Sequence, residues 1–314
     1  MKNYSVRTYT PGDFDLWNDF IAKAKNATFL FHRNFMEYHK DRFIDFSLLV
    51  FENKKLVAVL PANKVGEELH SHQGLTYGGL VINKRTGFKE VENIFDSVCV
   101  FLKNSKINKI NIKSFLPFYS DYNSEELSYI FWDKGAKKYK KQLNLAIDYS
   151  KELQVSKSKQ KHFRRVESLG LEIRIDEAFD VFWDKVLIPK LNLKYNTNPV
   201  HSLSEIKLLK DYFPKNIIQC NVYKNDTILA GITLFISNNV VKSQYGATTG
   251  EGEKYRALDY LFISLISKFK DKYSFFDMGT VNNPDSDTYN EGLLKQKEEL
   301  GCSVYIQDFY ELEL

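Results

Sequence analysis

The chain has 314 residues and a mass of 36.7 kDa, and 43% of its residues are hydrophobic. This is enough apolar material for one large domain or two medium ones, and it excludes a largely disordered chain. The 44 basic and 40 acidic side chains are mostly interspersed and give a net charge of +4, which indicates an ordinary solvated surface.

The cysteines and the N-terminal sequence indicate a cellular compartment. Cys99, Cys220 and Cys302 are far apart, form no CxxC motif and lie within apolar runs, which is typical of buried free thiols in a reducing environment. The opening MKNYSVRTYT has no apolar signal region, and no run approaches the ~20 apolar residues of a membrane helix. We therefore expect a soluble, cytoplasmic protein without integral membrane insertion.

In the first half, residues 6–21 predict a short strand, a Pro-Gly-Asp helix start and an amphipathic helix that carries Trp17. Residues 46–65 alternate apolar and polar side chains around Asn53-Lys54, as a hairpin does. A strand with a Tyr-Gly step, LHSHQGLTYGGLV, follows from residue 69. A helix over 88–103, a strand over 107–115, and a helix and strand over 124–149 complete the series.

The second half repeats this order. Residues 173–188 predict a strand and a helix carrying Trp183, and residues 217–238 predict a hairpin around Asn225-Asp226. The strand VVKSQYGATTG, a helix over 253–270, a strand over 273–281 and a helix and strand over 290–312 follow. The offset between Trp17 and Trp183 also separates the strands that begin at Ile107 and Tyr273.

This repeat predicts two similar α/β (α+β) domains, each a mixed sheet flanked by helices. The alternative is that any two α/β domains share a β-α-β rhythm, but the matching residues favour a duplication. We place the domains at residues 1–150 and 151–314. A basic helix over residues 156–165 opens the second domain.

The order of elements resembles the GNAT acyltransferase fold, and tandem copies of that fold resemble the FemAB/FemX-like transferases. The segment NEGLLKQKEELG from residue 290 carries the most specific match. It contains a Gly-Leu pair, a lysine four residues after the leucine and a glycine four residues after that lysine: Gly292-Leu293, Lys297 and Gly301. The basic segment 156–165 also resembles the helix that opens the family's second domain.

The resemblance implies an N-acyltransferase in which Lys297 lies near the reacting acyl group and stabilises charge on the carbonyl oxygen. The alternative is a solvent-facing lysine on an amphipathic helix. Simple GNAT acetyltransferases often carry a tyrosine acid at this position. Here it is replaced by Lys297, and by Phe131 in the first copy. The absence of the tyrosine acid is tolerable if the thiolate leaves without being protonated.

The donor site that the resemblance implies is the strand and Gly-containing turn over residues 244–257. In a GNAT-like domain this strand supplies a backbone N–H, and the loop and helix start receive a pyrophosphate. Glu251 and Glu253 oppose an anion there, so a plain polar turn is the alternative. The predicted donor-binding residues are Tyr245, Gly246, Gly250, Gly252, Lys254 and Arg256.

Asp277, at the end of an apolar strand, is predicted to deprotonate or orient an acceptor amine, with capping of the following loop as the alternative. The first-domain stretch HSHQGLTYGGLV contains Tyr77-Gly78-Gly79, which resembles a step that borders the acceptor cleft of FemAB-like proteins. His72, which shares a strand face with His70, is a candidate general base. The two histidines lack the partners that a zinc site requires, so no metal is predicted.

His32 and His39, seven residues apart, share one face if they lie on one helix, and they then border the acceptor cleft or the core edge. The predicted acceptor-binding residues are Tyr77, Gly78, Gly79, His32, His39, Tyr289 and Asn290.

The leading functional prediction is transfer of an acyl group, acetyl in particular, from an acyl-CoA to an amine. The acceptor is a small molecule or glycan precursor such as an amino sugar of the cell envelope. One alternative is a FemABX-type peptidyltransferase that uses aminoacyl-tRNA, which the basic segment 157–165 favours only weakly because such a charge run is usually a solvated helix face. The other alternative is a non-catalytic GNAT-like binding module.

Overall fold

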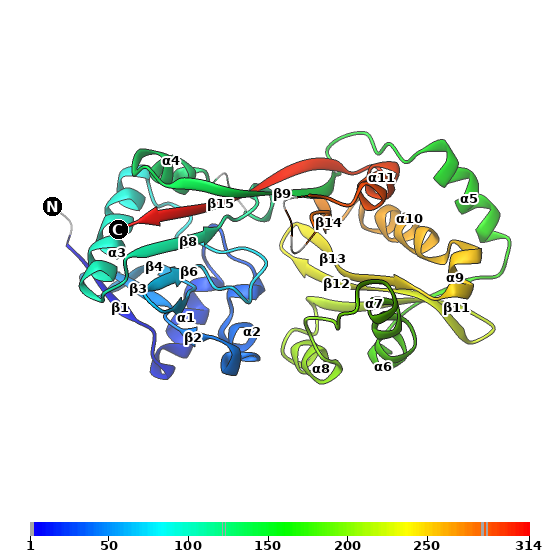
Figure 1. Ribbon diagram of the computed structural model, residues 1–314, viewed down its shortest axis with the longest axis horizontal. Helices are drawn as coiled ribbons and strands as arrows, with labels where there is room; N and C mark the ends of the chain where they lie inside the picture. Colours follow the sequence, from blue (N-terminus) through cyan, green and yellow to red (C-terminus); the bar gives the residue numbers. More distant parts are fainter. Residues whose placement is uncertain (1–2, 121, 123, 284–285, 287) are drawn as a thin grey trace. The chain divides into compact units, whose positions relative to one another are not determined.

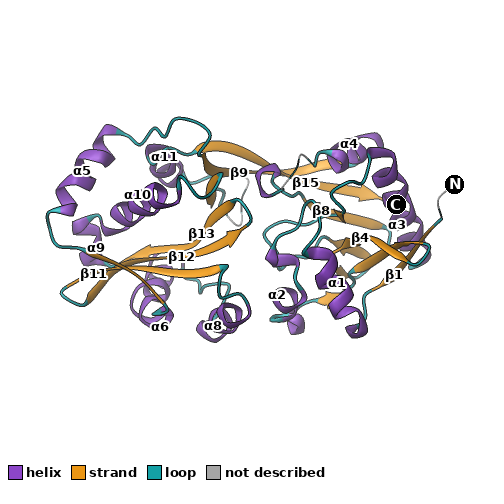
Figure 2. Ribbon diagram, turned by 180° about the vertical axis from the view of Figure 1, so that it is seen from behind, coloured by secondary structure: helices purple, strands orange, loops and turns teal. Residues whose placement is uncertain are grey.

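The computed structural model describes residues 3–120, 122, 124–283, 286 and 288–314. The chain divides into two compact units. The first comprises Met1–Gln142 and Ile306–Leu314, and the second comprises Leu143–Tyr305. Both are mixed α/β structures, as the ribbon in Figure 1 and the view from behind in Figure 2 show. The sequence-based prediction of an α/β fold is therefore confirmed.

The first unit contains two groups of strands. The helices are α1 (Phe14–Ile21), α2 (Arg33–Glu37), α3 (Phe88–Asn104) and α4 (Glu126–Asp133). The strands are β1 (Tyr4–Thr8), β2 (Ile44–Asp45), β3 (Leu48–Glu52), β4 (Lys55–Leu60), β5 (Asn63–Val65), β6 (Glu68–His70), β7 (Val81–Ile82) and β8 (Lys109–Lys113). The order β1-β3-β4-β7 is antiparallel throughout. In the other group, β2 pairs with β5 and β5 with β6 in antiparallel, and β6 pairs with β8 in parallel.

The second unit has one mixed sheet. Its helices are α5 (Lys157–Glu167), α6 (Phe179–Phe182), α7 (Ile188–Tyr195), α8 (Leu203–Tyr212), α9 (Gly250–Tyr255), α10 (Ala257–Phe269) and α11 (Glu291–Glu299). Its strands are β10 (Glu172–Asp176), β11 (Ile217–Lys224), β12 (Thr227–Ser237), β13 (Val240–Thr248) and β14 (Phe275–Thr280). Neighbouring strands from β10 to β13 are antiparallel, and β13 and β14 are parallel. A π-helical turn over Trp183–Leu187 joins α6 to α7.

Helices cover both faces of each unit. In the second unit, Figures 1 and 2 show α10 and α11 on one side of β11–β13 and α6 and α8 on the other. In the first unit, the same views show α3 and α4 as one group of helices and α1 and α2 as another. The periodicity of α10 accounts for its place, because Leu261, Leu265 and Phe269 recur at helical spacing and are buried. At the β11–β12 turn, Asn225 and Asp226 both have positive φ, as a two-residue hairpin turn requires. No helix among the described residues is long and apolar enough to span a membrane.

Two long strands, β9 (Lys137–Asp148) and β15 (Ser303–Glu313), run through the boundary between the units. The end of β9 pairs with β14 in the second unit, whereas the end of β15 pairs with β8 in the first. Each unit therefore receives its last strand from the other half of the chain. This differs from the predicted division at residue 150, because a periodicity pattern locates a strand but does not identify its pairing partner.

The strand predicted over residues 69–81 is not continuous in the structure. The strand β6 ends at His70 and β7 begins at Val81, and the residues between them form turns. His72 has a positive φ of 55° and so does not continue a strand face with His70. A turn-rich segment can show strand-like alternation when its apolar residues are buried, as Leu75, Tyr77 and Leu80 are here.

The end of β15 should carry much of the first unit's stability. Leu312 is 7% exposed and lies in a core that includes Tyr310 and Phe131. Replacing Leu312 by Ala removes buried methyl groups and should lower the free energy of unfolding by about 2–4 kcal/mol. The matched change Val304→Ala, at a 46% exposed position of the same strand, should lower it by less than about 0.5 kcal/mol. Urea titration followed by tryptophan fluorescence measures both, and equal effects would contradict the assignment.

Candidate functional site

The second unit contains a point where two parallel strands separate. The recorded pairs of β13 and β14 run from Val240–Phe275 to Lys242–Asp277, and both strands continue beyond the last pair. One residue later, the pairing of β13 with β12 shifts. Tyr245 lies opposite Thr233 and Ser243 opposite Leu234, so Gln244 is an extra residue in β13. A bulge of this kind leaves the backbone of the extra residue outside the ladder.

A cavity of about 530 Å³ opens at this separation. Its walls come from β13, β14, α7, α9, α10 and α11. The apolar lining residues are Leu187, Leu191, Ala247, Leu258, Phe262, Met278 and Leu293. The charged lining residues are Lys190, Lys194, Glu253, Arg256, Asp259 and Lys297. The mixture suits a ligand with an extended, weakly polar arm and an anionic end.

Lys297 lines this cavity from α11, whose N-terminus is capped by the Asn290 side chain. Only 5% of Lys297 is exposed. Its Nζ donates to the carbonyl oxygens of Gly279 at 3.0 Å and Thr280 at 2.9 Å. Burial lowers the pKa of Lys297 to about 8, and the Lys242 ammonium adds to the shift. The lysine singled out by the Gly-Leu…Lys…Gly pattern thus lies at the cavity rather than on a solvent-facing helix side.

Asp277 is fully buried and is the centre of a hydrogen-bond network. Its Oδ1 accepts from Asn144 Nδ2 and from the backbone N–H of Gly279, both at 2.7 Å. Its Oδ2 accepts from Lys242 Nζ at 3.1 Å. A carboxylate with these donors is stabilised in its charged form and is shielded from solvent. The geometry therefore suits a residue that organises the strand ends, and it argues against the predicted general base.

Only some of the predicted donor-binding residues line the cavity. Gly246, Gly252 and Arg256 line the cavity, whereas Gly250 and Lys254 are exposed residues of α9. The N–H of Gly252 donates to Thr249 Oγ1 at 3.0 Å, so this amide is capped by the chain itself. A Cβ at Gly252 would come within 2.2 Å of the Leu229 carbonyl oxygen. Gly252 therefore permits close packing of α9 on β12, which is a structural reason for glycine at this position.

Tyr245 is hydrogen-bonded to His201 of the same unit. Its Oη lies 2.5 Å from His201 Nδ1 and accepts from the His201 backbone N–H at 3.1 Å. Burial raises the pKa of Tyr245 to about 12. The cations contributed by α7, Lys190 and Lys194, were missed by the sequence analysis. Lys190 pairs with Glu253, a contact between residues too far apart in sequence to be read from a local pattern.

Most predicted acceptor-binding residues of the first unit are structural. Tyr77 is 1% exposed, its Oη lies 2.8 Å from Thr28 Oγ1, and its ring packs against Phe31. A Cβ at Gly78 would lie 2.2 Å from the Ser71 carbonyl oxygen, and Gly79 has a φ of 120°, so both need to be glycine. Gly78 also borders a small cavity of about 180 Å³ together with Phe131.

His72 is 5% exposed, and its ring lies 5.3 Å from the His39 ring and 5.2 Å from the Phe43 ring, measured between centroids. Burial lowers the pKa of His72 to about 3, and the neighbouring His39 adds to the shift. An imidazole in this environment is a weak base and is enclosed by rings. The structure therefore does not support His72 as the general base.

His32 and His39 do not share a helix, because α2 extends only from Arg33 to Glu37. His32 caps that helix by accepting the Asn34 N–H at 3.2 Å, and His39 lies beyond its end. In the second unit, Tyr289 is 44% exposed. Asn290 caps α11 and so helps to position Lys297 without lining the cavity itself.

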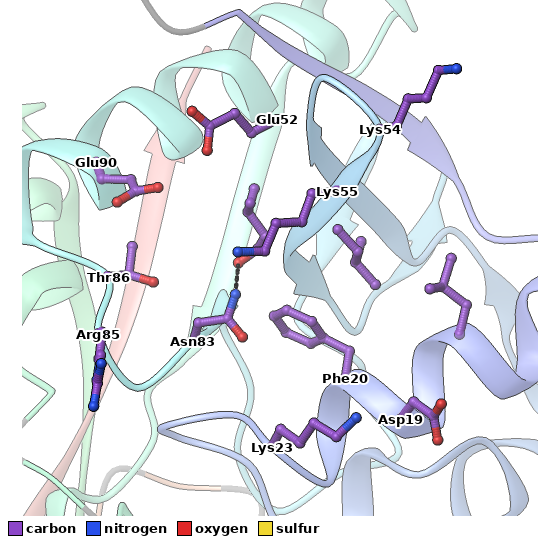
Figure 3. Close-up of a pocket in the computed structure, with 13 residues that line it drawn as sticks. Asp19, Phe20, Lys23, Glu52, Lys54, Lys55, Asn83, Arg85, Thr86 and Glu90 are labelled. Carbon is purple, nitrogen blue, oxygen red and sulfur yellow. Dashed lines mark hydrogen bonds between the residues drawn. The ribbon is translucent and has the colours of Figure 1, made fainter.

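A larger, more open cavity of about 690 Å³ lies in the first unit between α1, the β3–β4 hairpin and the start of α3 (Figure 3). Phe20 points into it, and Asn83 Nδ2 donates to the Val57 carbonyl oxygen at 3.5 Å. Its rim is formed by charged side chains of both signs, including Lys23 and Glu90. Among the described residues, no three His, Cys, Asp or Glu side chains gather so that they can hold a metal ion.

Solved structures with the same fold were found by comparison, whereas no protein-family model and no curated protein sequence matches the chain. FemX is 13% identical, with a TM-score of 0.69 over 99% of this chain and 97% of its own. L-PGS from Bacillus licheniformis is 13% identical, with a TM-score of 0.62 over 96% and 91%. A tandem GNAT protein of the clavulanic acid biosynthesis pathway is 9% identical, with a TM-score of 0.53 over 99% and 98%. The chain therefore has a FemX-like tandem GNAT fold, and that prediction is confirmed.

The buried His72 should make stability depend on pH. Its pKa in the fold, about 3, lies below the ordinary value, so the unfolded chain binds a proton that the folded chain excludes. The contribution of His72 to the free energy of unfolding is fully present above about pH 6.5. The free energy of unfolding should fall by up to about 1.4 kcal/mol per pH unit as the pH decreases toward 3. His72→Gln should flatten the pH dependence of the unfolding free energy between pH 7 and 5. The control His162→Gln, at a partly exposed position, should change the slope less than His72→Gln does, and an unchanged slope in His72→Gln would contradict the assignment.

Proposed function

We propose that the second unit catalyses transfer of an acyl group from an acyl-CoA to an amine of a small-molecule or cell-envelope precursor such as an amino sugar. The observation that carries the proposal is the cavity at the separation of β13 and β14, with a bulge at Gln244 on one wall and the buried Lys297 on the other. The shared fold with FemX and a tandem GNAT protein supports it.

The reaction needs a neutral amine that attacks the acyl carbonyl and donors that stabilise the resulting oxyanion. The backbone freed from the ladder at Gln244 supplies an N–H of the required kind at the strand separation. The amine forms the new C–N bond and loses its proton to solvent. The C–S bond then breaks and the thiolate leaves.

Lys297 is placed to assist the departure of the thiolate. An ordinary lysine is too weak an acid, but a pKa of about 8 is close to that of a thiol, about 8.5. The Lys297 ammonium can therefore donate a proton to the sulfur as the C–S bond breaks. In this proposal Lys297 takes the part of the tyrosine acid of simple GNAT enzymes, so the thiolate need not leave unprotonated.

The donor assignment rests on the cavity lining. Lys190, Lys194 and Arg256 lie beside an apolar wall, which fits the phosphates and the extended arm of an acyl-CoA. The observation that favours an aminoacyl-tRNA instead is the exposed basic face of α5. That face is formed by Lys157, Lys161, Arg164 and Arg165. The free cysteines Cys99, Cys220 and Cys302 are consistent with the reducing cytoplasm that either donor requires.

Acetyl-CoA should bind the wild-type protein saturably in isothermal titration. Gly246→Phe introduces a ring into the cavity wall near Phe262 and should reduce the affinity at least about tenfold. Lys23→Ala, on the rim of the first-unit cavity, should leave the affinity unchanged. Binding of a charged tRNA together with no heat from acetyl-CoA would reject the acyl-CoA donor and favour the alternative.

Removing the Lys297 ammonium should impair the transfer step more than donor binding. Lys297→Ala should lower kcat for acetyl transfer to an amino-sugar panel by roughly 100-fold while acetyl-CoA still binds. Lys295→Ala, an exposed lysine on the same helix, is the matched control and should keep full activity. If Lys297→Ala transfers acetyl at the wild-type rate, the acid role is wrong. Absence of transfer in the wild-type protein with every donor and acceptor would favour the binding-module alternative.

A further inference from the structure

Lys297 lines the second-unit cavity, and Lys242 and Asp277 adjoin the lining residues Ser243 and Met278 in the chain. Lys242 extends from β13 at the last pair before the strands separate, and Lys297 extends from α11. Asp277 accepts from Lys242 at 3.1 Å, whereas Lys297 donates to two neutral backbone carbonyls. The carboxylate is thus held by one lysine, and the other lysine keeps its charge beside the cavity.

The arrangement has an electrostatic consequence. Both ammonium groups are shielded from water, with Lys242 side-chain exposure at 12% and Lys297 at 5%. Among the described residues that act on Lys297, Lys242 is a second cation and Asp277 is the one carboxylate, so positive charge exceeds negative charge in this group. An unmatched buried charge is unfavourable unless a ligand or a developing negative charge compensates it. The excess therefore favours an anionic group, or an anion that forms during reaction, at Lys297.

Asp277 is the natural ion-pair partner for either lysine. Asn144 and the Gly279 N–H fix its Oδ1, and Lys242 occupies its Oδ2. Without the ammonium group of Lys242, the carboxylate would attract Lys297 more strongly, and the Lys297 ammonium would be stabilised by this attraction.

We propose that Lys242 is a positioning residue that occupies Asp277 and so keeps the Lys297 ammonium available to the cavity. This inference rests on the proposed function in one respect, namely that Lys297 serves acyl transfer. It adds a residue that neither the sequence motif nor the fold comparison indicated. It also assigns Asp277 a role through Lys242 and Lys297 rather than in contact with a substrate.

Several charged groups surround Lys297 and set its titration. Lys242 on β13 and Asp277 on β14 act in opposite directions, and Cys302 at the start of β15 contributes a further effect. Arg256 and Asp259, from the α9–α10 junction, face the same cavity. Asp259 is paired with Lys159 at 2.6 Å, so its charge is already compensated. Lys242 is therefore the substitution that changes the balance at Lys297 most directly.

The test is a pH titration of Lys297 by NMR in the full-length protein with isotope-labelled lysine, with the signal assigned by its loss in Lys297→Arg. The wild-type midpoint should lie near 8. Lys242→Met should raise it by about one unit or more, because a like charge is removed and Asp277 is released. Lys242→Arg keeps the cation and should leave the midpoint near the wild-type value.

A second variant guards against a folding defect. Lys242→Gln can still donate to Asp277 but carries no charge, and it should raise the midpoint as Lys242→Met does. An unchanged midpoint in folded Lys242→Met or Lys242→Gln overturns the proposal. The NMR titration requires no substrate, so its outcome is independent of the acyl-transfer assay. An unchanged midpoint would reject the role of Lys242 alone, and absence of transfer would reject the proposed function alone. With an active acceptor, kcat should fall roughly tenfold in Lys242→Met, with the KM for acetyl-CoA unchanged and kcat restored in Lys242→Arg.

Discussion

The buried carboxylate of Asp277 is the interaction around which the second unit's site is organised. A charge fully removed from water is stable only if donors surround it, and here they come from three separate strands. Satisfying Asp277 brings Lys242 of β13 and Asn144 of β9 onto β14. The same turn at Gly279, whose φ is 73°, presents its carbonyl and the next one to Lys297. The Asp277 carboxylate thus links β9, β13 and β14 next to the carbonyl groups that hold the cavity lysine.

The two units use the same scaffold with different chemistry. The offset that relates Trp17 to Trp183 also relates Phe131 to Lys297 and Asn111 to Asp277. In the first unit, Phe131 is 2% exposed and packs on Tyr310, and Asn111 donates to Glu68. The lining of the small first-unit cavity includes the acidic residues Glu125 and Asp308, whereas that of the second-unit cavity includes several basic residues, Lys297 among them. The buried lysine of the proposed acyl-transfer site is therefore replaced by a phenylalanine at the equivalent position of the first unit.

Features encoded by local spacing were predictable from the sequence. The hairpin at Asn225-Asp226 and helix α10 follow from turn chemistry and periodicity. Lys297 was singled out because the segment that begins at Asn290 resembles the Gly-Leu…Lys…Gly pattern of FemAB-like proteins. Features that depend on tertiary partners were not predictable. The enclosure of His72 by His39 and Phe43, and the contribution of Lys190 from α7, arise between segments that no pattern within one segment connects. Asp277 was predicted from the sequence to deprotonate or orient an acceptor amine, whereas its contacts with Asn144 and Lys242 join separate segments and were not predictable.

The exchange of the strand ends of β9 and β15 bears on the order in which the chain folds. Domains usually fold as they leave the ribosome, with the N-terminal one first. Here the first unit acquires Tyr310 and Leu312 for its core only when residues 306–314 have been synthesised. Until then, β8 exposes an unpaired edge of the kind that recruits other strands. The first unit is therefore completed only after the whole second unit has been synthesised, and residues 306–314 close an edge prone to aggregation.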